Sequence, residues 1–340
     1  MSQTLTIGIV GTGMIADVIS RAALESKNVV LKAVSSRSLD RAEEFLTTLP
    51  SNSAKAYGSW LQLIDDPSLS AVYLATPTAV KEEIGLAAIA KGKHVLIDKP
   101  FATVDSLKTL KVAAEKAGVL LMDATHFSHN PRTKFLQDNL ERHIGEPQSI
   151  RVSFLFPFED RSNIRFDPTM EPTGALGDMG WYPMRAAVEF FGTDLKIASG
   201  LTSIDREGEA IIGARGMLVF ENKKTIQWEV GYNRNDLAMD LEIGGSQGIA
   251  HLDDFVLDYQ GGFAVSEFGE TSGVSVRKGF QPHRKAEFLA NESTQPQQVL
   301  MLDHLAEVIG LGSSHFMAKL LVDKAEKTQE LLDSLITWER

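Results

Sequence analysis

A glycine-rich turn is the first of three short segments whose residue types and spacing could carry out chemistry. The turn at 11–16 directly follows an apolar run at 5–10 and precedes a helical pattern. In this G-x-G-x-x-A spacing, Gly11 permits a tight turn, Gly13 lets a pyrophosphate approach the backbone, and Ala16 lets the helix pack close to the strand. The motif predicts dinucleotide binding, whereas the alternative is a tight turn without a ligand. The residues predicted to contact the cofactor here are Gly11, Thr12, Gly13, Met14 and Ile15.

Two further segments follow apolar runs in the same half of the chain. Ala75-Thr76-Pro77 follows the run at 71–74, and Asp98-Lys99-Pro100 follows the run at 94–97. Ligands of open α/β sheets bind beyond the carboxyl ends of the strands, so both segments are predicted to face the cofactor. The ammonium of Lys99 could bind a substrate hydroxyl and stabilise alkoxide charge. The alternative is a surface lysine after a strand. The cofactor contacts predicted in these segments are Ala75, Thr76, Pro77, Asp98 and Lys99.

The third segment is the glycine-rich stretch 174–183, which contains Asp178 and Tyr182 four residues apart. If the segment opens a helix, the two side chains share a face. A tyrosine in such a place could accept and donate a proton during catalysis. The alternative is a core tyrosine and an aspartate that caps a helix.

The choice of dinucleotide depends on the end of the second strand. An enzyme selective for NAD usually has a carboxylate there, which binds the ribose 2′-hydroxyl. Here the strand ends Ser35-Ser36-Arg37-Ser38, where hydroxyls and a guanidinium could hold a 2′-phosphate instead. We therefore predict NADP as the preferred cofactor, with NAD still possible. The alternative is a solvated Arg37 and a Ser38 that caps the next helix.

Alternating elements occupy residues 1–122, and their apolar strands predict a parallel, doubly wound sheet. The expected strands are 5–10, 29–34, 71–75, 94–97 and 119–122, and the expected helices are 14–26, 39–49, 59–64, 79–91 and 103–117. We predict that residues 1–122 form a dinucleotide-binding Rossmann domain.

A different pattern begins near residue 123. Several strands follow one another without helices between them, which predicts an antiparallel sheet. The expected strands are 149–156, 196–204, 210–220, 224–232, 238–243 and 248–252, and the expected helices are 131–143, part of 174–192, 296–311 and 316–337. The predicted fold class is therefore an α/β Rossmann domain followed by an α+β domain, at 123–340, with a large open antiparallel sheet for substrate binding and oligomer contacts.

Composition excludes several functional classes. The 340 residues include no cysteine, which excludes disulfides, cysteine nucleophiles and thiolate metal sites and fits a reducing compartment. A net charge of −11 argues against nucleic acid or an anionic membrane as partner. A strand begins almost at once, which leaves no room for a signal peptide, and no apolar run reaches about 18 residues. We expect a cytoplasmic protein.

Two motifs are typical of other functions, namely hydrolysis and metal binding, but their surroundings do not support these functions. Residues 244–248 match the G-x-S-x-G elbow of hydrolases, but a strand rather than a helix follows, so we predict a hairpin turn. His126 and His129 are three residues apart without clustered carboxylates, so no metal is expected.

The order of these motifs resembles the Gfo/Idh/MocA oxidoreductase family over nearly the whole chain. The resemblance implies hydride transfer between NAD(P) and a hydroxyl-bearing carbon of a sugar, a polyol or a related small molecule. Lys99 is similar to the lysine of the family's Glu-Lys-Pro motif. Tyr182 stands where inositol dehydrogenase-like members have histidine, as in the branch with glucose–fructose oxidoreductase, dimeric dihydrodiol dehydrogenase and xylose dehydrogenases.

The chain departs from the family pattern at several positions. Asp98 replaces the usual glutamate, and Thr78 and Lys81 stand where an asparagine and a histidine are common. Relatives often carry an arginine within the segment that here spans 126–131, so we expect a substrate that differs from theirs. The residues predicted to bind substrate are His126, Asn130 and Trp181.

The mechanism implied by the resemblance uses three side chains. Tyr182 takes the proton of the substrate hydroxyl, Lys99 stabilises the alkoxide-like charge, and Asp178 orients that pair or the substrate. A sheet with one open face predicts a homodimer or a higher homo-oligomer. Two other functions remain open, namely a cofactor-binding sensor on the same scaffold and a lyase or glycosidase that retains NAD. The identity of the substrate is not predicted.

Overall fold

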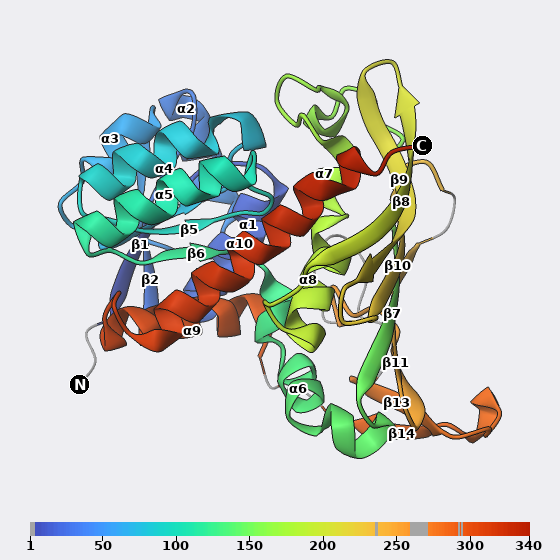
Figure 1. Ribbon diagram of the computed structural model, residues 1–340. Coiled ribbons are helices and arrows are strands. Elements are labelled where there is room, and N and C mark those ends of the chain that lie inside the picture. Colours follow the sequence, from blue (N-terminus) through green and yellow to red (C-terminus); the bar gives the residue numbers. More distant parts are fainter. Residues whose placement is uncertain (1–3, 235–236, 259–270, 292, 294) are drawn as a thin grey trace. The chain divides into compact units, whose positions relative to one another are not determined.

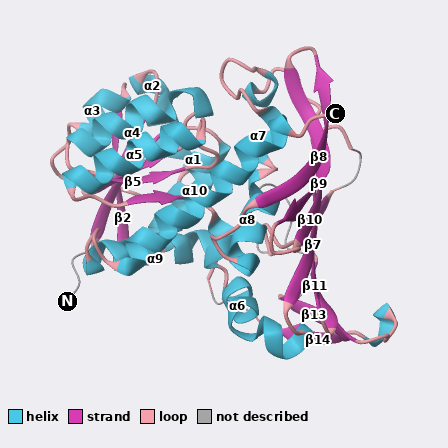
Figure 2. Ribbon diagram, viewed as in Figure 1, coloured by secondary structure: helices cyan, strands magenta, loops and turns pink. Residues whose placement is uncertain are grey.

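A computed structural model describes residues 4–234, 237–258, 271–291, 293 and 295–340 (Figure 1). The chain divides into two compact units. The first consists of residues 1–129 and 295–326, and the second consists of residues 130–294 and 327–340. Each unit has its own sheet, shown in magenta in Figure 2.

The sheet of the first unit has six parallel strands in the order β3-β2-β1-β4-β5-β6. The strands are β1 (Leu5–Val10), β2 (Val29–Ser35), β3 (Lys55–Tyr57), β4 (Ala71–Leu74), β5 (His94–Ile97) and β6 (Leu121–Asp123). The predicted doubly wound Rossmann sheet is therefore confirmed. Sequence reasoning missed β3, because three residues that begin with a lysine carry no periodic signal.

Helices cover both faces of this sheet. They are α1 (Met14–Glu25), α2 (Leu39–Thr48), α3 (Trp60–Ile64), α4 (Lys81–Ala90), α5 (Val104–Ala117) and α9 (Gln297–Leu311). Ile7 and Ile9 of β1 belong to one buried cluster with Ile19 of α1 and Leu302 of α9. On the other face, a side chain at Gly85 of α4 would meet Leu110 of α5 at 2.8 Å. Alternate residues of the strands thus fill two cores.

The sheet of the second unit has eight strands in the order β14-β13-β12-β11-β7-β10-β9-β8. The strands are β7 (Pro147–Leu155), β8 (Ile197–Glu207), β9 (Ala210–Phe220), β10 (Thr225–Gly231), β11 (Ala238–Gly245), β12 (Gly248–Leu252), β13 (Gly273–Lys278) and β14 (Glu287–Ala290). All neighbours pair antiparallel except β7 and β10, which pair parallel. The prediction of a large antiparallel sheet is confirmed with that one exception. The short strands β13 and β14 were not predicted.

The helices of the second unit differ in one respect from the prediction. They are α6 (Pro131–Ile144), α7 (Gly174–Asp178) and α8 (Trp181–Phe191), joined by the last part of α10 (Phe316–Thr337). The helix expected as part of 174–192 is found as α8, but the segment also holds the shorter α7, and the two are separated at Met179 and Gly180. Asp178 ends α7 and Tyr182 belongs to α8, so the predicted shared face of one helix does not apply.

Residues 295–326 group with the first unit, because α9 buries its apolar face there. Val299, Leu302, Leu305 and Val308 all belong to the cluster that contains Ile7. The division by compactness therefore differs from the division predicted at residue 122. Assignment of the later residues to substrate binding and oligomer contacts remains a prediction.

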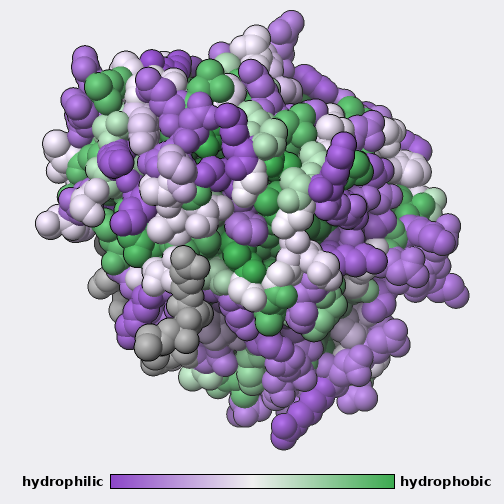
Figure 3. Space-filling view, turned by 90° about the vertical axis from the view of Figure 1, so that its left-hand side faces the viewer, coloured by the Kyte–Doolittle hydropathy of each residue, from purple (hydrophilic) through white to green (hydrophobic). Residues whose placement is uncertain are grey.

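Hydrophilic residues predominate on the face of the molecule shown in Figure 3, with hydrophobic residues scattered among them. Among the described residues, no helix combines the length and the apolar character that crossing a bilayer requires.

Candidate active site

The glycine-rich turn after β1 has a geometry that only small residues allow. Gly11 has a φ of +121°, and a Cβ there would lie 2.5 Å from the carbonyl oxygen of Ala75. Gly13 precedes α1, and a Cβ on it would meet no atom within 4 Å. The N-terminus of this 12-residue helix therefore opens onto free space, where its N–H groups can receive an anion. Met14, Ile15 and the buried Ala16 begin the helix.

The hydroxyl groups at the end of β2 face this turn. The Oγ atom of Ser36 lies 3.1 Å from Oγ1 of Thr12. Ser35 is fully buried and its hydroxyl has no hydrogen-bond partner, which is unusual for a buried polar atom. Arg37 is exposed. Ser38 caps α2 by accepting a hydrogen bond from the backbone N–H of Arg41, as the alternative interpretation expected.

The segment after β4 contributes a second buried hydroxyl without a partner. Ala75 continues the ladder by donating its N–H to the carbonyl of Val10 at 2.9 Å. The Oγ1 atom of Thr76 is buried and makes no hydrogen bond, and Pro77 precedes the short helix η1 (Thr78–Val80). Ser35 and Thr76 thus offer unsatisfied hydroxyls at the carboxyl ends of two strands of one sheet.

Asp98 and Lys99 follow β5 in the same unit. The hydroxyl of Tyr73 donates a hydrogen bond to Oδ1 of Asp98 at 3.1 Å, which fixes the carboxylate that replaces the family's glutamate. The peptide bond between Lys99 and Pro100 is cis.

His126 begins the short helix η2 (His126–His129) and is almost fully buried. Burial, together with the nearby charge of Lys99, lowers the pKa of His126 to about 3, so the ring is neutral at physiological pH. Its Nδ1 atom lies 2.9 Å from Nε2 of Gln297, and an amide NH₂ can only donate. Nδ1 is therefore the acceptor, and the ring proton is on Nε2. The imidazole lies in the neighbourhood of Lys99 as an uncharged donor.

Tyr182 lies in the second unit, where aromatic rings hold it. It is 3% exposed, with the ring of Phe154 at 5.0 Å and the ring of Phe255 at 6.4 Å, both edge to face. Contacts of this kind orient the phenol ring. Trp181 beside it is fully buried, which makes it a core residue. Its predicted contact with substrate, like that of the other predicted site residues, remains a prediction.

Asp178 has two partners that sequence reasoning missed. Its Oδ2 atom accepts hydrogen bonds from Nε of Arg165 at 2.8 Å and from the hydroxyl of Tyr232 at 2.9 Å. Burial alone would lower the pKa of Arg165, but the charge of Asp178 raises it. Burial and Asp178 raise the pKa of Tyr232 well above its usual value. Asp178 is thus held in place as an acceptor by this pair.

Asn130 is engaged in the structure of its own unit. Its Oδ1 atom caps α6 by accepting from the N–H of Arg132, and its Nδ2 atom donates to Asp258 at 2.6 Å. These bonds give Asn130 a structural role. Arg132 and Asp258 are both almost fully buried and form an ion pair at 3.2 Å.

The motifs typical of hydrolysis and metal binding have structural explanations. Within 244–248, Ser246 and Gln247 form the hairpin turn between β11 and β12, as predicted, and Ser246 accepts a hydrogen bond from the N–H of Glu146. His126 and His129 each contact α9 through Nδ1, the first at Gln297 and the second at His304. Within the part of the chain that the structure describes, no group of three or more metal-ligating side chains occurs.

Comparisons with known proteins agree with these features. A family model described as "Oxidoreductase family, NAD-binding Rossmann fold" matches residues 5–125, and a GFO/IDH/MocA C-terminal domain matches residues 140–251. A dTDP-3,4-didehydro-2,6-dideoxy-alpha-D-glucose 3-reductase of Actinomadura kijaniata is 30% identical over 250 residues, which cover 73% of this chain and 74% of the relative. A scyllo-inositol 2-dehydrogenase (NADP(+)) of Bacillus subtilis is 32% identical over 225 residues, or 62% of this chain and 67% of that protein.

The fold matches that of a solved 3-ketoreductase from Actinomadura kijaniata in complex with NADP and TDP-benzene. The TM-score is 0.85 at 23% identity, and the match covers 99% of this chain and 98% of that one. Other structures of that enzyme carry a substitution at one tyrosine or at one lysine.

Proposed function

Because this chain belongs to the Gfo/Idh/MocA family of oxidoreductases, as its sequence predicted, we propose that it transfers a hydride between NADP(H) and a CH–OH or carbonyl carbon of a sugar or polyol. The observation that carries the proposal is the edge of the first unit's sheet at which the parallel strands have their carboxyl ends. The open helix N-terminus at Gly13 and the unsatisfied hydroxyls of Ser35 and Thr76 all belong to this edge. Relatives named as NADP-dependent polyol and sugar dehydrogenases support the choice of cofactor and substrate class.

The residues at this edge fit a dinucleotide. The N-terminus of α1 would hold the pyrophosphate, since Gly13 leaves room for it. Ser36, Thr12 and the exposed Arg37 would hold the 2′-phosphate of NADP, with NAD as the weaker alternative. When bound, the nicotinamide supplies the hydride chemistry.

The side chains of this protein supply proton transfer and charge. In the oxidation direction, the Tyr182 phenol accepts the proton of the substrate hydroxyl, and the Lys99 ammonium stabilises the developing alkoxide charge. Asp178, fixed by Arg165 and Tyr232, orients the lysine and tyrosine or the substrate. In the reduction direction, the proton returns from Tyr182 to the carbonyl oxygen.

A turnover assay tests this function directly. The purified chain is mixed with NADPH or NADH and with a panel of sugars, polyols and small carbonyl compounds, and absorbance of the reduced cofactor is followed. We expect turnover with at least one member and a preference for NADP(H). Tightly retained NAD without net turnover would instead indicate a lyase or glycosidase, and cofactor binding without any turnover would indicate a sensor. Either result overturns the proposal.

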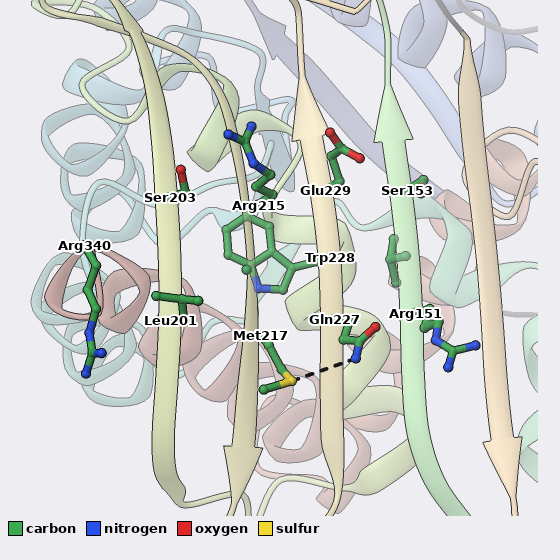
Figure 4. A pocket seen from close by; sticks show the side chains of 12 residues that line it. Arg151, Ser153, Leu201, Ser203, Arg215, Met217, Gln227, Trp228, Glu229 and Arg340 are labelled. Atoms are coloured by element: carbon green, nitrogen blue, oxygen red, sulfur yellow. Dashed lines mark hydrogen bonds between the residues drawn. The ribbon is translucent and has the colours of Figure 1, made fainter.

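We also propose that the exposed face of the second sheet joins two copies of the chain (Figure 4). Two rows of side chains cross the strands of this face, namely Leu201, Met217, Gln227 and Arg151, and Ser203, Arg215, Glu229 and Ser153. Leu201 and Met217 are large apolar residues that remain 48% and 38% exposed. Arg215 and Glu229 give the next row both signs of charge, which favours pairing with a copy of itself.

Analytical ultracentrifugation tests the homodimer. We expect a dimer for the natural chain and a monomer for Met217→Glu, since a carboxylate would be buried against the second copy. Leu61→Glu is the matched control, because Leu61 is also exposed but lies on α3 of the first unit. A monomeric natural chain at micromolar concentration contradicts the dimer.

Because the reaction needs the cellular pool of NADP(H), we propose the cytoplasm as the location of this protein, which cell fractionation can check.

A further inference from the structure

A buried lysine binds the backbone carbonyls of Lys99 and Pro100. Lys81 is the first residue of α4 and is 3% exposed. Its Nζ atom donates to the carbonyl oxygen of Pro100 at 3.0 Å, to that of Lys99 at 3.3 Å and to Oγ1 of Thr78 at 3.3 Å. An ammonium has three protons to donate, so these three acceptors match its capacity.

The carbonyls of Lys99 and Pro100 lie just beyond the ladder of the sheet. The ladder reaches the N–H of Asp98, which donates to Leu74, and the carbonyl of Ile97, which accepts from Ala124. Proline has no N–H to donate, so the turn after β5 has fewer backbone bonds to hold it. The Lys81 ammonium anchors the turn at the point where the strand pairing ends.

Local stability does not explain a lysine at this position. A positive charge at the first residue of a helix opposes the helix dipole. Removing an ammonium from water also costs free energy, which only its hydrogen bonds offset. Residues that violate local preferences in this way are found at functional sites. Thr78 and Lys81, the two positions after Thr76-Pro77 at which the chain departs from its family's pattern, are moreover bonded to each other.

We propose that Lys81 is a positioning residue for Lys99. Its ammonium fixes the carbonyl of the cis peptide bond and the carbonyl of Pro100, and thereby the backbone from which the Lys99 side chain extends. The proposal rests on the assignment of Lys99 as the catalytic lysine under the proposed function.

The chain provides a matched control at the other end of the same strand. Lys93 immediately precedes β5, is 7% exposed, and donates to the carbonyls of Asp66 at 2.8 Å and Leu69 at 2.7 Å. Lys93 thus makes the same kind of bonds without touching the predicted site. With a substrate from the panel, we expect Lys81→Met to lower kcat about 10-fold or more, with KM for NADPH changed less than about threefold. Lys93→Met should lower the melting temperature while the folded enzyme keeps its kcat.

A second measurement needs no substrate. Lysines are methylated with ¹³C-formaldehyde, and the Lys99 signal is identified by its loss in Lys99→Arg. Release of the Lys99 backbone should change the chemical shift of this signal in Lys81→Met but not in Lys93→Met. An unchanged signal together with an unchanged kcat overturns the role of Lys81. If the natural chain turns over no substrate, the proposed function fails, whereas this measurement still decides the inference.

Chemical rescue distinguishes the loss of the Lys81 ammonium from a folding defect of the variant. The chain has no cysteine, so a cysteine introduced by Lys81→Cys can be alkylated selectively with bromoethylamine in denaturant and refolded. The product restores an ammonium on a side chain of the same length. We expect it to regain most of the lost kcat and the original Lys99 signal. Recovery of folded protein without recovery of either property would refute the inference.

Discussion

The charge of Lys99 acts on His126, and together with burial it keeps the imidazole uncharged, with a pKa of about 3. Both residues belong to the first unit. A neutral ring beside an ammonium can donate from Nε2 while Nδ1 accepts from Gln297. The pair thus combines one cation with one uncharged donor.

This relationship predicts an acid-sensitive stability. His126 binds a proton in the unfolded chain near pH 6.5 but in the folded chain only near pH 3. The unfolded state therefore binds more protons between these values, and stability falls by about 1.4 kcal/mol for each unit of pH below 6.5. Urea unfolding at pH 7 and pH 5 should show a smaller loss for His126→Gln than for the natural chain. The exposed His283→Gln is the control and should match the natural chain.

Removal of the proposed catalytic groups should separate chemistry from binding. We expect Lys99→Ala and Tyr182→Phe each to lower kcat by about 10²-fold or more, because each removes a group that acts in the transition state. Tyr182→Phe keeps the ring between Phe154 and Phe255, so NADPH binding measured by fluorescence should be nearly unchanged. Near-normal turnover in either variant would remove that residue from the mechanism.

Substitution of Arg37 should change the choice of cofactor. Arg37→Ala is expected to weaken NADPH binding about 10-fold or more, since a charge-assisted bond to the 2′-phosphate is lost, while NADH binding changes little. Arg41→Ala is the control, because Arg41 is an exposed arginine in the following helix. Fluorescence titration with both cofactors measures the difference. Equal losses for NADPH and NADH would mean that Arg37 does not contact the 2′-phosphate.

The carboxylate of Asp178 should matter more than its shape. Asp178→Asn keeps the size of the side chain but leaves the guanidinium of Arg165 without its anionic partner. We expect kcat to fall about 10-fold and the melting temperature to fall as well. Tyr232→Phe removes only the neutral donor and should have the smaller effect on both. A larger effect of Tyr232→Phe would mean that the bond from Tyr232, and not the charge of Asp178 beside Arg165, matters more.

The buried ion pair of the second unit should dominate stability rather than activity. Arg132→Met leaves Asp258 as a buried, uncompensated carboxylate and should cost about 3–5 kcal/mol of unfolding free energy. Lys134→Met, on the same helix, removes an exposed pair with Asp138 and should cost at most about 1 kcal/mol. Urea denaturation of both variants provides the comparison. Similar costs would contradict the special role of the buried pair.

Sequence patterns predicted the regular elements well where a long period or a sharp turn was present. The turn at Gly11, the strands 5–10 and 210–220, and the helix 316–337 lie where expected. Strands β3, β13 and β14 escaped because they lack the continuous apolar run that indicated the equally short β4 and β5. The break between α7 and α8 also escaped. Gly180 approaches the carbonyl of Leu176, four residues earlier, so closely that a Cβ would lie 2.2 Å from it, and the G-x-x-G spacing alone did not reveal this local distortion.

The partners of site residues were harder to predict than the site residues. Arg165 and Tyr232 lie 13 and 54 positions from Asp178, and neither belongs to a motif. Lys81 was recognised only as a departure from the family pattern, because its bonds to Lys99 and Pro100 depend on how α4 packs beside β5. Periodicity indicates which residues are buried, but it does not show which polar groups meet there.

The return of α9 to the first sheet has a consequence for biosynthesis. Ile7 and Ile9 leave the ribosome about 290 residues before Val299, Leu302 and Leu305, which share their cluster. Until then α1 lies on this face of the sheet without α9. The core of the first unit is therefore completed only after residues 130–294 of the second unit have been made.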